Sequence, residues 1–246
     1  MLEDLLTNPE KFRAAKDYRA TYKVFPVEYK GKNYIVKKTS LKSFIANHYY
    51  TLLDKTFFDT RVYCSSAKHL AEEANKLNIL NGHFAPRLIA YKKGLLIKEY
   101  IYGASFRQMN IGSQRNALES IIQTVQEIHS RSVTIGDAHV KNYIHPYKWI
   151  DFDGKFKSLG SEDDKALDLL KLIYSTYITA NTKDFRKREA LTYLMAYDIK
   201  RYYKNKKVLF TLGYMLEPAK PLWKLWLNTR IPRDGLMLKE LRKMFR

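Results

Sequence analysis

Two aspartates and an asparagine have side chains and spacings suited to phosphate chemistry. Asp137 and Asn142 lie five residues apart in one segment, and Asp151 follows after a short apolar stretch. A carboxylate can orient an attacking hydroxyl group, and carboxylate and amide oxygens can bind the magnesium ions that neutralise phosphate charge. The set predicts phosphoryl transfer, with Asp137 as the catalytic carboxylate and Asn142 and Asp151 as metal ligands.

The sequence around these residues resembles a known catalytic loop. The pattern Gly-Asp-x-His-x-x-Asn over Gly136 to Asn142, followed by Ile-Asp-Phe over Ile150 to Phe152, resembles that of small bacterial and archaeal kinase-like phosphotransferases. The intervening His145-Pro146 is typical of a turn. The resemblance implies ATP and Mg²⁺ as cofactors. It also makes His139 a second candidate catalytic residue, with a purely structural hydrogen-bonding role as the alternative.

Three segments upstream continue the resemblance in the same chain order. Lys37 follows an apolar strand and looks like the lysine that holds the α- and β-phosphates of ATP, with Glu73 as its helical partner. Glu99, Tyr100 and Ile101 look like the hinge whose backbone binds adenine. The resemblance therefore implies a nucleotide site that uses all five of these residues.

The choice of Glu73 as partner depends on helical phase. If Glu73 faces the inside of its helix, Leu77 and Leu80 follow on the same side, four and seven residues later. Glu72 remains the alternative, because only one of the two adjacent glutamates can face that side.

The elements that must position these residues can be predicted from periodicity and turn signals. We expect a hairpin of strands 22–28 and 33–37 around Lys30-Gly31-Lys32, a helix over 65–80, a strand over 95–101, a helix over 113–130, and mostly helices from Glu162 onward. This order predicts an α+β, two-lobed protein-kinase-like fold, with a small β-rich N-lobe (1–100) and a mostly helical C-lobe (101–246). The aromatic segment 41–61 cannot be assigned.

The composition points to anionic partners. The net charge is +19 over 246 residues, and the stretch from Lys183 to Arg246 holds 17 Lys and Arg against 6 Asp and Glu, a net of +11. A field of this sign recruits polyanions such as anionic lipid headgroups, phosphorylated glycans or nucleic acid.

The lone Cys64 favours a reducing compartment, and no apolar run is long enough for a membrane helix. We expect a cytoplasmic protein, either soluble or peripheral on the inner face of the cytoplasmic membrane.

Departures from the protein-kinase pattern bear on the acceptor. No Gly-x-Gly-x-x-Gly precedes Lys37, and no Ala-Pro-Glu follows Asp151, so the platform for an extended peptide is missing and a small or glycan hydroxyl is the better acceptor. The connection from Lys37 to Glu73 is long, basic and aromatic. With the basic surface, it resembles the heptose kinases of the lipopolysaccharide inner core, which implies an anionic glycolipid or glycan acceptor at a membrane surface.

Two other functions stay open from the sequence. The segment Glu162 to Leu170 resembles that of the small atypical serine/threonine kinases of the tRNA threonylcarbamoyladenosine complex. A third possibility is a basic pseudokinase that binds nucleic acid or membrane without catalysis, for which Lys200 to Lys207 would be suitable. The presence together of Lys37, Asp137, Asn142 and Asp151 argues against lost chemistry.

Overall fold

The first two strands form the expected hairpin. In the computed structural model, β1 (Lys23–Tyr29) pairs antiparallel with β2 (Lys32–Lys38). The two turn residues, Lys30 and Gly31, have φ values of 52° and 69°. Positive φ at both positions gives the tight turn whose twist matches that of the flanking strands, and glycine adopts it without steric cost.

Two further strands complete an antiparallel sheet in the order β1-β2-β4-β3. They are β3 (Leu88–Lys92) and β4 (Leu95–Glu99). Val36 pairs with Phe25 on one side and Ile97 on the other, and all three are buried on one face of the sheet. Leu5, from the short helix α1 (Glu3–Thr7), joins this apolar cluster.

The predicted helix after the hairpin is α3 (Ser66–Leu80), which contacts β3 and β4. Leu70, Leu77 and Leu80 are fully buried, as the helical spacing indicated. The helix ends where expected, because Asn81 and Gly82 take positive φ values of 45° and 81°.

The structure describes residues 3–18, 21–46, 48–49, 66–152, 160–216 and 236–245. The chain divides into two compact units. One comprises the described residues up to Tyr102 together with Phe152, and the other comprises Gly103 to Asp151 and the described residues from Gly160 onward.

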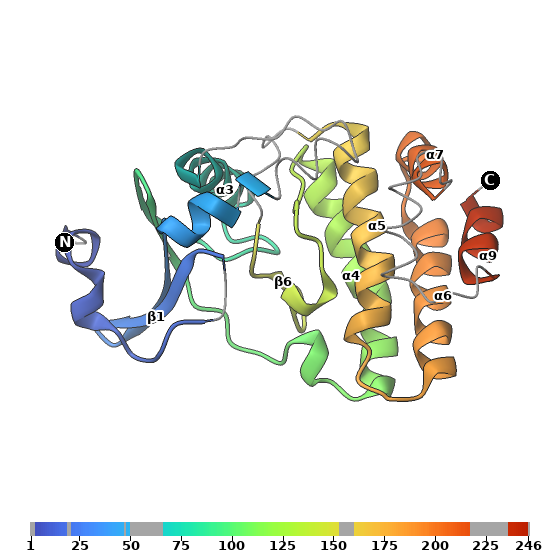
Figure 1. Cartoon of the computed structure of the whole chain (residues 1–246), viewed down its shortest axis with the longest axis horizontal. Helices are drawn as coiled ribbons and strands as arrows, with labels where there is room; N and C mark the ends of the chain where they lie inside the picture. The colour runs from blue at the N-terminus through green and yellow to red at the C-terminus, as the bar shows by residue number, and fades with distance from the viewer. Residues whose placement is uncertain are drawn as a thin grey trace. The chain divides into compact units, whose positions relative to one another are not determined.

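The second unit is mostly helical. Its longer helices are α4 (Ile111–Ser130), α5 (Glu162–Thr179), α6 (Phe185–Tyr202), α7 (Lys206–Met215) and α9 (Leu236–Phe245). Helix α6 packs against α4, α5 and α9 (Figure 1). Polar side chains cap the starts of four of these helices: Asn110, Ser161, Asp184 and Asn205 each accept a hydrogen bond from a backbone N–H of the first turn.

Short elements link α4 to α5. The turn of 3₁₀ helix η3 (Val140–Asn142) leads into the two-residue strands β5 (Tyr143–Ile144) and β6 (Lys148–Trp149), which pair around His145-Pro146. Other single 3₁₀ turns are η1 (Pro9–Phe12) and η2 (Phe106–Gln108). The α+β class, with a small antiparallel sheet followed by a mostly helical remainder, is confirmed.

Some expectations differ from the structure or fall outside it. Strand β3 was not anticipated, and β4 ends at Glu99, so Tyr100 and Ile101 lie beyond the strand. Cys64 and most of segment 41–61 lie outside the described residues. Within the described ranges, no helix is long and apolar enough to cross a membrane.

Candidate active site

In the first unit, Lys37 and Glu73 form a buried ion pair. Lys37 Nζ lies 2.6 Å from Glu73 Oε2, and the two residues are 7% and 1% exposed. The Lys37 ammonium also lies 4.8 Å from the centre of the Tyr22 ring, within reach of a cation–π contact. The structure thus joins the strand lysine to Glu73 of α3 across 36 residues of sequence.

The same carboxylate has a second lysine partner. Lys98 Nζ donates to Glu73 Oε1 at 2.7 Å, and Lys98 is 5% exposed. Lys98 comes from β4, where it stands opposite Ile35 of the neighbouring strand β2. Residues opposite one another in an antiparallel pair share a face, as do residues two apart in one strand. Lys98 and Lys37 therefore lie on the same face, the one that Glu73 approaches.

The three residues predicted as a hinge lie next to this strand. Glu99 exchanges backbone and side-chain contacts with Arg87: its N–H donates to the Arg87 carbonyl at 3.0 Å, and its Oε2 accepts from the Arg87 N–H at 3.1 Å. The Tyr100 N–H donates to the Asn33 carbonyl at 3.4 Å. Ile101 follows outside any strand and is partly buried. All three belong to the same unit as Lys37 and Glu73.

In the second unit, Asp137, His139 and Asn142 come together in one loop. Asn142 Nδ2 donates to Asp137 Oδ2 at 3.1 Å and also to the Asp137 carbonyl at 3.1 Å. The amide nitrogen of Asn142 is thus occupied, which leaves its amide oxygen as the atom suited to a metal. The other oxygen of Asp137, Oδ1, lies 3.4 Å from His139 Nε2.

Tyr174 is a further contact of this group that the sequence did not indicate. Its hydroxyl lies 2.6 Å from His139 Nε2 and comes from α5. A hydrogen on Nε2 would face both the Tyr174 hydroxyl and the Asp137 carboxylate, so we infer that this nitrogen is the protonated one. The imidazole then links Asp137 to a buried helix.

One face of α5 holds the loop in place. Asp168 accepts from the backbone N–H groups of Ile135, at 2.7 Å, and Gly136, at 2.8 Å, while Lys171 donates to the Gly136 carbonyl. Gly136 has a φ of 80°, which glycine adopts readily. Ser175 adds a bond from the Val140 N–H at 3.0 Å.

Asp168 is itself held by a buried polar chain. His129 Nε2 lies 3.1 Å from Asp168 Oδ2, and His129 Nδ1 lies 2.7 Å from the Tyr203 hydroxyl. Burial, and to a lesser extent the Asp168 carboxylate, raise the pKa of Tyr203 well above its ordinary value. Tyr203 therefore stays neutral at physiological pH.

Asp151 is the residue predicted to complete the metal site. It is partly buried and directly follows Ile150, whose N–H donates to the Asn142 carbonyl at 3.0 Å. The backbone of the loop is thus tied to the residue that precedes Asp151. Magnesium binds through one or two carboxylates with phosphates and water, and an amide oxygen with a carboxylate fits that preference. Among the described residues, no three His, Cys, Asp or Glu side chains gather as a metal cluster.

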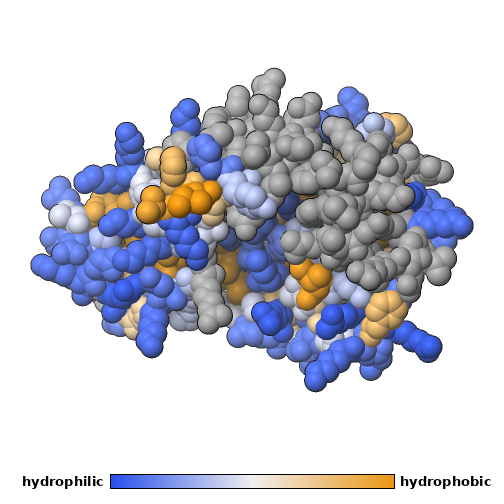
Figure 2. All heavy atoms as spheres, in the orientation of Figure 1, coloured by the Kyte–Doolittle hydropathy of each residue, from blue (hydrophilic) through white to orange (hydrophobic). Residues whose placement is uncertain are grey.

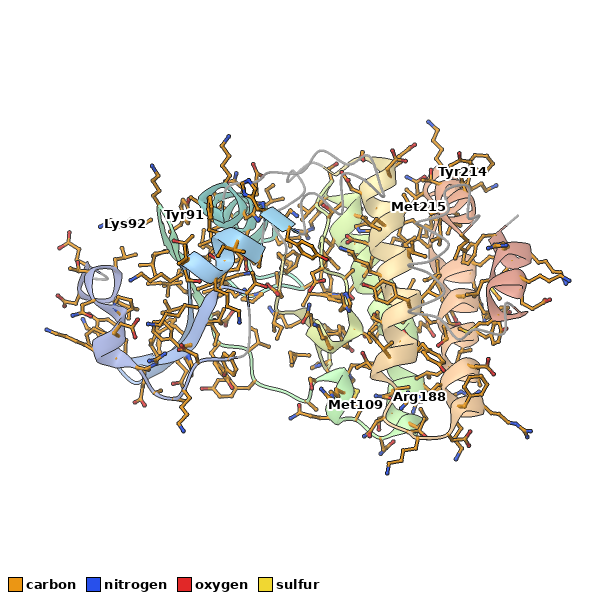
Figure 3. The ribbon with its side chains drawn as sticks, viewed as in Figure 1. Tyr91, Lys92, Met109, Arg188, Tyr214 and Met215 are labelled. Atoms are coloured by element: carbon orange, nitrogen blue, oxygen red, sulfur yellow. The ribbon has the colours of Figure 1, made fainter. Side chains whose placement is uncertain are left out.

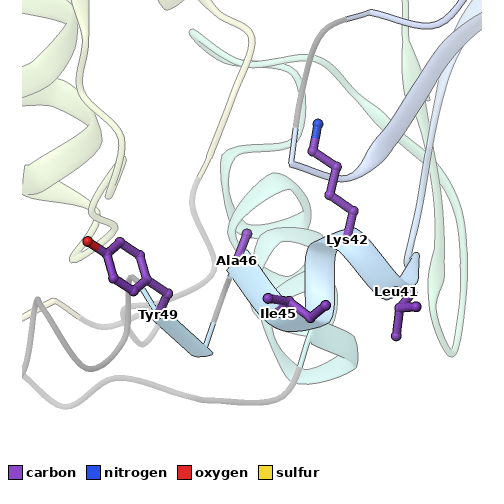
Figure 4. A pocket seen from close by; sticks show the side chains of 5 residues that line it. All are labelled: Leu41, Lys42, Ile45, Ala46 and Tyr49. Atoms are coloured by element: carbon purple, nitrogen blue, oxygen red, sulfur yellow. The ribbon is translucent and has the colours of Figure 1, made fainter.

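A separate apolar groove of about 500 Å³ lies on the first unit (Figure 4). Its lining residues are Leu41, Lys42, Ile45, Ala46 and Tyr49. None of the predicted site residues lines it. In Figure 2 apolar atoms gather over the helical residues 41–46, in line with the 78% and 61% exposure of Leu41 and Ile45.

A scan against protein-family models and a search of curated proteins both give no match. Solved structures with a similar fold include WaaP in complex with acyl carrier protein, at 13% identity and a TM-score of 0.49, covering 97% of this chain and 92% of that one. They also include a MAP kinase from Leishmania major, at 12% identity and a TM-score of 0.39, covering 100% of this chain and 81% of that one. Rad53 in complex with AMP-PNP is a third, at 16% identity and a TM-score of 0.41, covering 94% of this chain and 55% of that one.

At these identities and TM-scores the similarities carry no conclusion about a substrate or a reaction. The chain itself carries a buried Lys37–Glu73 pair on an antiparallel sheet, and an Asp137–Asn142 loop anchored on a helix of a second, mostly helical unit. The chain has a kinase-like fold.

Proposed function

We propose that this chain is an ATP-dependent phosphotransferase whose acceptor is a sugar hydroxyl of the lipopolysaccharide inner core, most simply heptose. The observation that carries the proposal is the loop of Asp137 and Asn142, in which both oxygens of the Asp137 carboxylate have a defined neighbour and the backbone is fixed by Asp168. Phosphoryl transfer depends chiefly on positioning and on charge, and this loop is built for positioning.

Each predicted residue then has a role. Asp137 orients the acceptor hydroxyl and accepts its proton as the phosphorus–oxygen bond forms. His139, held by Tyr174, orients Asp137. Lys37 binds the α- and β-phosphates of ATP, and Glu73 fixes the lysine. Backbone groups of Glu99 to Ile101 bind adenine.

Asn142 and Asp151 would hold Mg²⁺. The ion, when bound, supplies positive charge that neutralises the phosphate oxygens. The contribution of the protein is to present an amide oxygen and a carboxylate from consecutive, hydrogen-bonded parts of one chain segment.

An anionic acceptor at a membrane agrees with the surface of α6 and α7. Five basic residues at this helix junction are exposed: Lys200, Arg201, Lys204, Lys206 and Lys207. Phe210 and Tyr214, one turn apart on α7, are 77% and 66% exposed, and Tyr214 projects from the helix in Figure 3. Exposed aromatic residues flanked by lysines are typical of helices that lie in the headgroup region of an anionic bilayer. We therefore infer that the protein works at the cytoplasmic face of the inner membrane.

The test is an acceptor competition with γ-labelled ATP. The purified protein is given lipopolysaccharide core with unphosphorylated heptose, the proteins of the tRNA threonylcarbamoyladenosine complex, or buffer alone. We expect label in the glycan with the parent protein and none with Asp137→Asn. Label in the protein partners would favour the atypical serine/threonine kinase instead. ATP that is neither bound nor consumed in any arm would overturn a phosphotransferase function.

A further inference from the structure

Lys98 is a buried charge that the proposed reaction does not yet use. It follows the three apolar residues Leu95 to Ile97 of β4 and is 5% exposed to solvent. A lysine in such a place is rare unless it is paired or functional. It donates to Glu73, which also binds Lys37.

Two ammonium groups share the Glu73 carboxylate. Glu73 presents Oε2 to Lys37 at 2.6 Å and Oε1 to Lys98 at 2.7 Å. These three side chains together carry a formal charge of +1. Each of two ammonium groups that share one carboxylate is neutralised by it less than it would be as the sole partner of that carboxylate.

The sharing of Glu73 between two lysines also changes the electrostatic field around the Lys37 ammonium group. A carboxylate paired with one lysine alone would largely cancel the field of its ammonium group. Because Lys98 competes for Glu73, the field around Lys37 stays more positive, and a phosphate near Lys37 is attracted more strongly. Lys98 thereby acts on an anion even if it never contacts one.

We propose that Lys98 is an affinity-determining residue for nucleotide polyphosphates, acting through Glu73 on Lys37. The inference rests on the proposed function, since it assigns Lys37 to the phosphates of ATP. It makes Lys98 a positioning and charge-balancing residue. If Lys98 were only structural, we would expect two different results. Its loss would lower the stability of the free protein, and it would affect the binding of ligands with and without phosphates equally.

The experiment compares the parent with Lys98→Met and Lys98→Gln. Methionine preserves length without charge, and glutamine keeps a hydrogen bond to Glu73 without charge. Binding of ATP and of adenosine is measured by calorimetry, with thermal unfolding of the free proteins. Lys92→Met, at the exposed end of β3 (Figure 3), is the matched control.

We expect both Lys98 variants to bind ATP about tenfold more weakly, because a positive charge next to the Lys37–Glu73 pair is lost, while adenosine binding stays at the level of the parent. The free variants should melt at or above the temperature of the parent. Lys98→Arg should restore ATP affinity at least in part.

Equal ATP affinity in the parent and in either folded neutral variant would overturn the inference alone. Equal losses for ATP and adenosine, or a lower melting temperature with unchanged ATP affinity, would also overturn it and leave Lys98 as a structural residue. A parent protein that binds neither ligand would overturn the proposed function, and the inference with it.

Discussion

The carboxylate of Asp137 has a different neighbour at each oxygen, with an amide nitrogen of Asn142 at Oδ2 and the imidazole of His139 at Oδ1. Both neighbours present hydrogens, so the carboxylate is held in one orientation. An amide in its place would present its own N–H₂ group to one of these donors. Substitution by asparagine would therefore remove the proposed proton acceptor and also disturb the orientation of the side chain.

We predict that Asp137→Asn lowers phosphoryl transfer by about two to four orders of magnitude, the usual contribution of a positioned general base. ATP binding and the melting temperature should remain close to those of the parent. Steady-state turnover and calorimetric ATP titration measure the two effects. Asp163→Asn, an exposed change in the first turn of α5, is the matched control. Turnover equal to the parent would remove Asp137 from the mechanism.

We predict that Asp151→Ala weakens binding of Mg-ATP, because it would delete a charged ligand proposed to hold the Mg²⁺ that accompanies ATP. Titrations of ATP with and without magnesium separate this effect from general damage. The variant should lose the magnesium-dependent part of the affinity. Identical affinity in variant and parent under both conditions would show that Asp151 holds no metal.

Spacing along the chain was informative for residues whose partners are local. Asp137 and Asn142 are five residues apart, and the sequence is enough to place them in one loop. Lys98 and Tyr174 escaped prediction because their partners lie 25 and 35 residues away and, unlike for Lys37 and Glu73, no family resemblance pointed to them. Which face of β4 presents Lys98 depends on its register with β2, and register is set by the whole sheet.

At the scale of elements, α5 is the structural support of the site. Asp168, Lys171 and Ser175 recur at helical spacing and reach the loop from one face. The sequence predicts mostly helices from Glu162 onward, where α5 begins. It cannot show that the buried polar stripe faces the loop, because that depends on packing between elements more than thirty residues apart. Strand β3 was missed for a related reason: only pairing with β4 distinguishes Leu88–Lys92 from a short loop.

On α6, next to α4, the charged form of Asp198 is electrostatically unfavourable. Burial, followed by repulsion from Glu119 of α4, raises the pKa of Asp198 on α6, while Arg201 opposes the effect. The charged form of Asp198 is thus less favourable in the folded state than in the unfolded state. Its unfavourable contribution is absent below the ordinary aspartate value of 3.8 and grows as pH rises through the raised pKa.

We therefore predict that Asp198→Asn melts about 2 °C higher than the parent at neutral pH, the shift expected for less than 1 kcal/mol in a chain of this size. The difference should shrink as the pH is lowered toward 3.8. Thermal unfolding of both proteins across this range measures it, with Asp163→Asn as control. A difference that widens on acidification would contradict the assignment.

At the scale of the whole molecule, charge is distributed unevenly. The net of +11 after Lys183 is more than half of the total of +19. Lys206 and Lys207 occupy the first positions of α7, where a cation is unfavourable for the helix. An anionic partner would offset the unfavourable position of these two lysines. In the proposed function, that partner is the bilayer that carries the acceptor.

We predict that replacing the five exposed basic residues of the α6–α7 junction, Lys200, Arg201, Lys204, Lys206 and Lys207, with glutamine sharply reduces binding to phosphatidylglycerol vesicles. Binding of the parent should weaken with added salt, because attraction to a charged leaflet is screened within about 8 Å at physiological ionic strength. ATP binding should survive. Vesicle co-sedimentation measures the change.

A matched variant carries five glutamines at exposed lysines of the first unit: Lys16, Lys32, Lys38, Lys92 and Lys93. It removes the same charge from elsewhere, so it should retain vesicle binding better. Unchanged vesicle binding in the junction variant, together with lost affinity for tRNA, would favour the tRNA-linked alternative over the glycolipid.

The anchoring of the loop on α5 has a consequence for its dynamics. The amide hydrogens of Ile135, Gly136 and Val140 are donated to side chains of one helix, so none can be released without breaking a buried contact of that helix. In hydrogen–deuterium exchange these three amides should therefore be protected to a similar degree as the interior of α5, although they lie outside any regular α-helix or strand. The loop that carries Asp137 would then open only when the helical core itself opens.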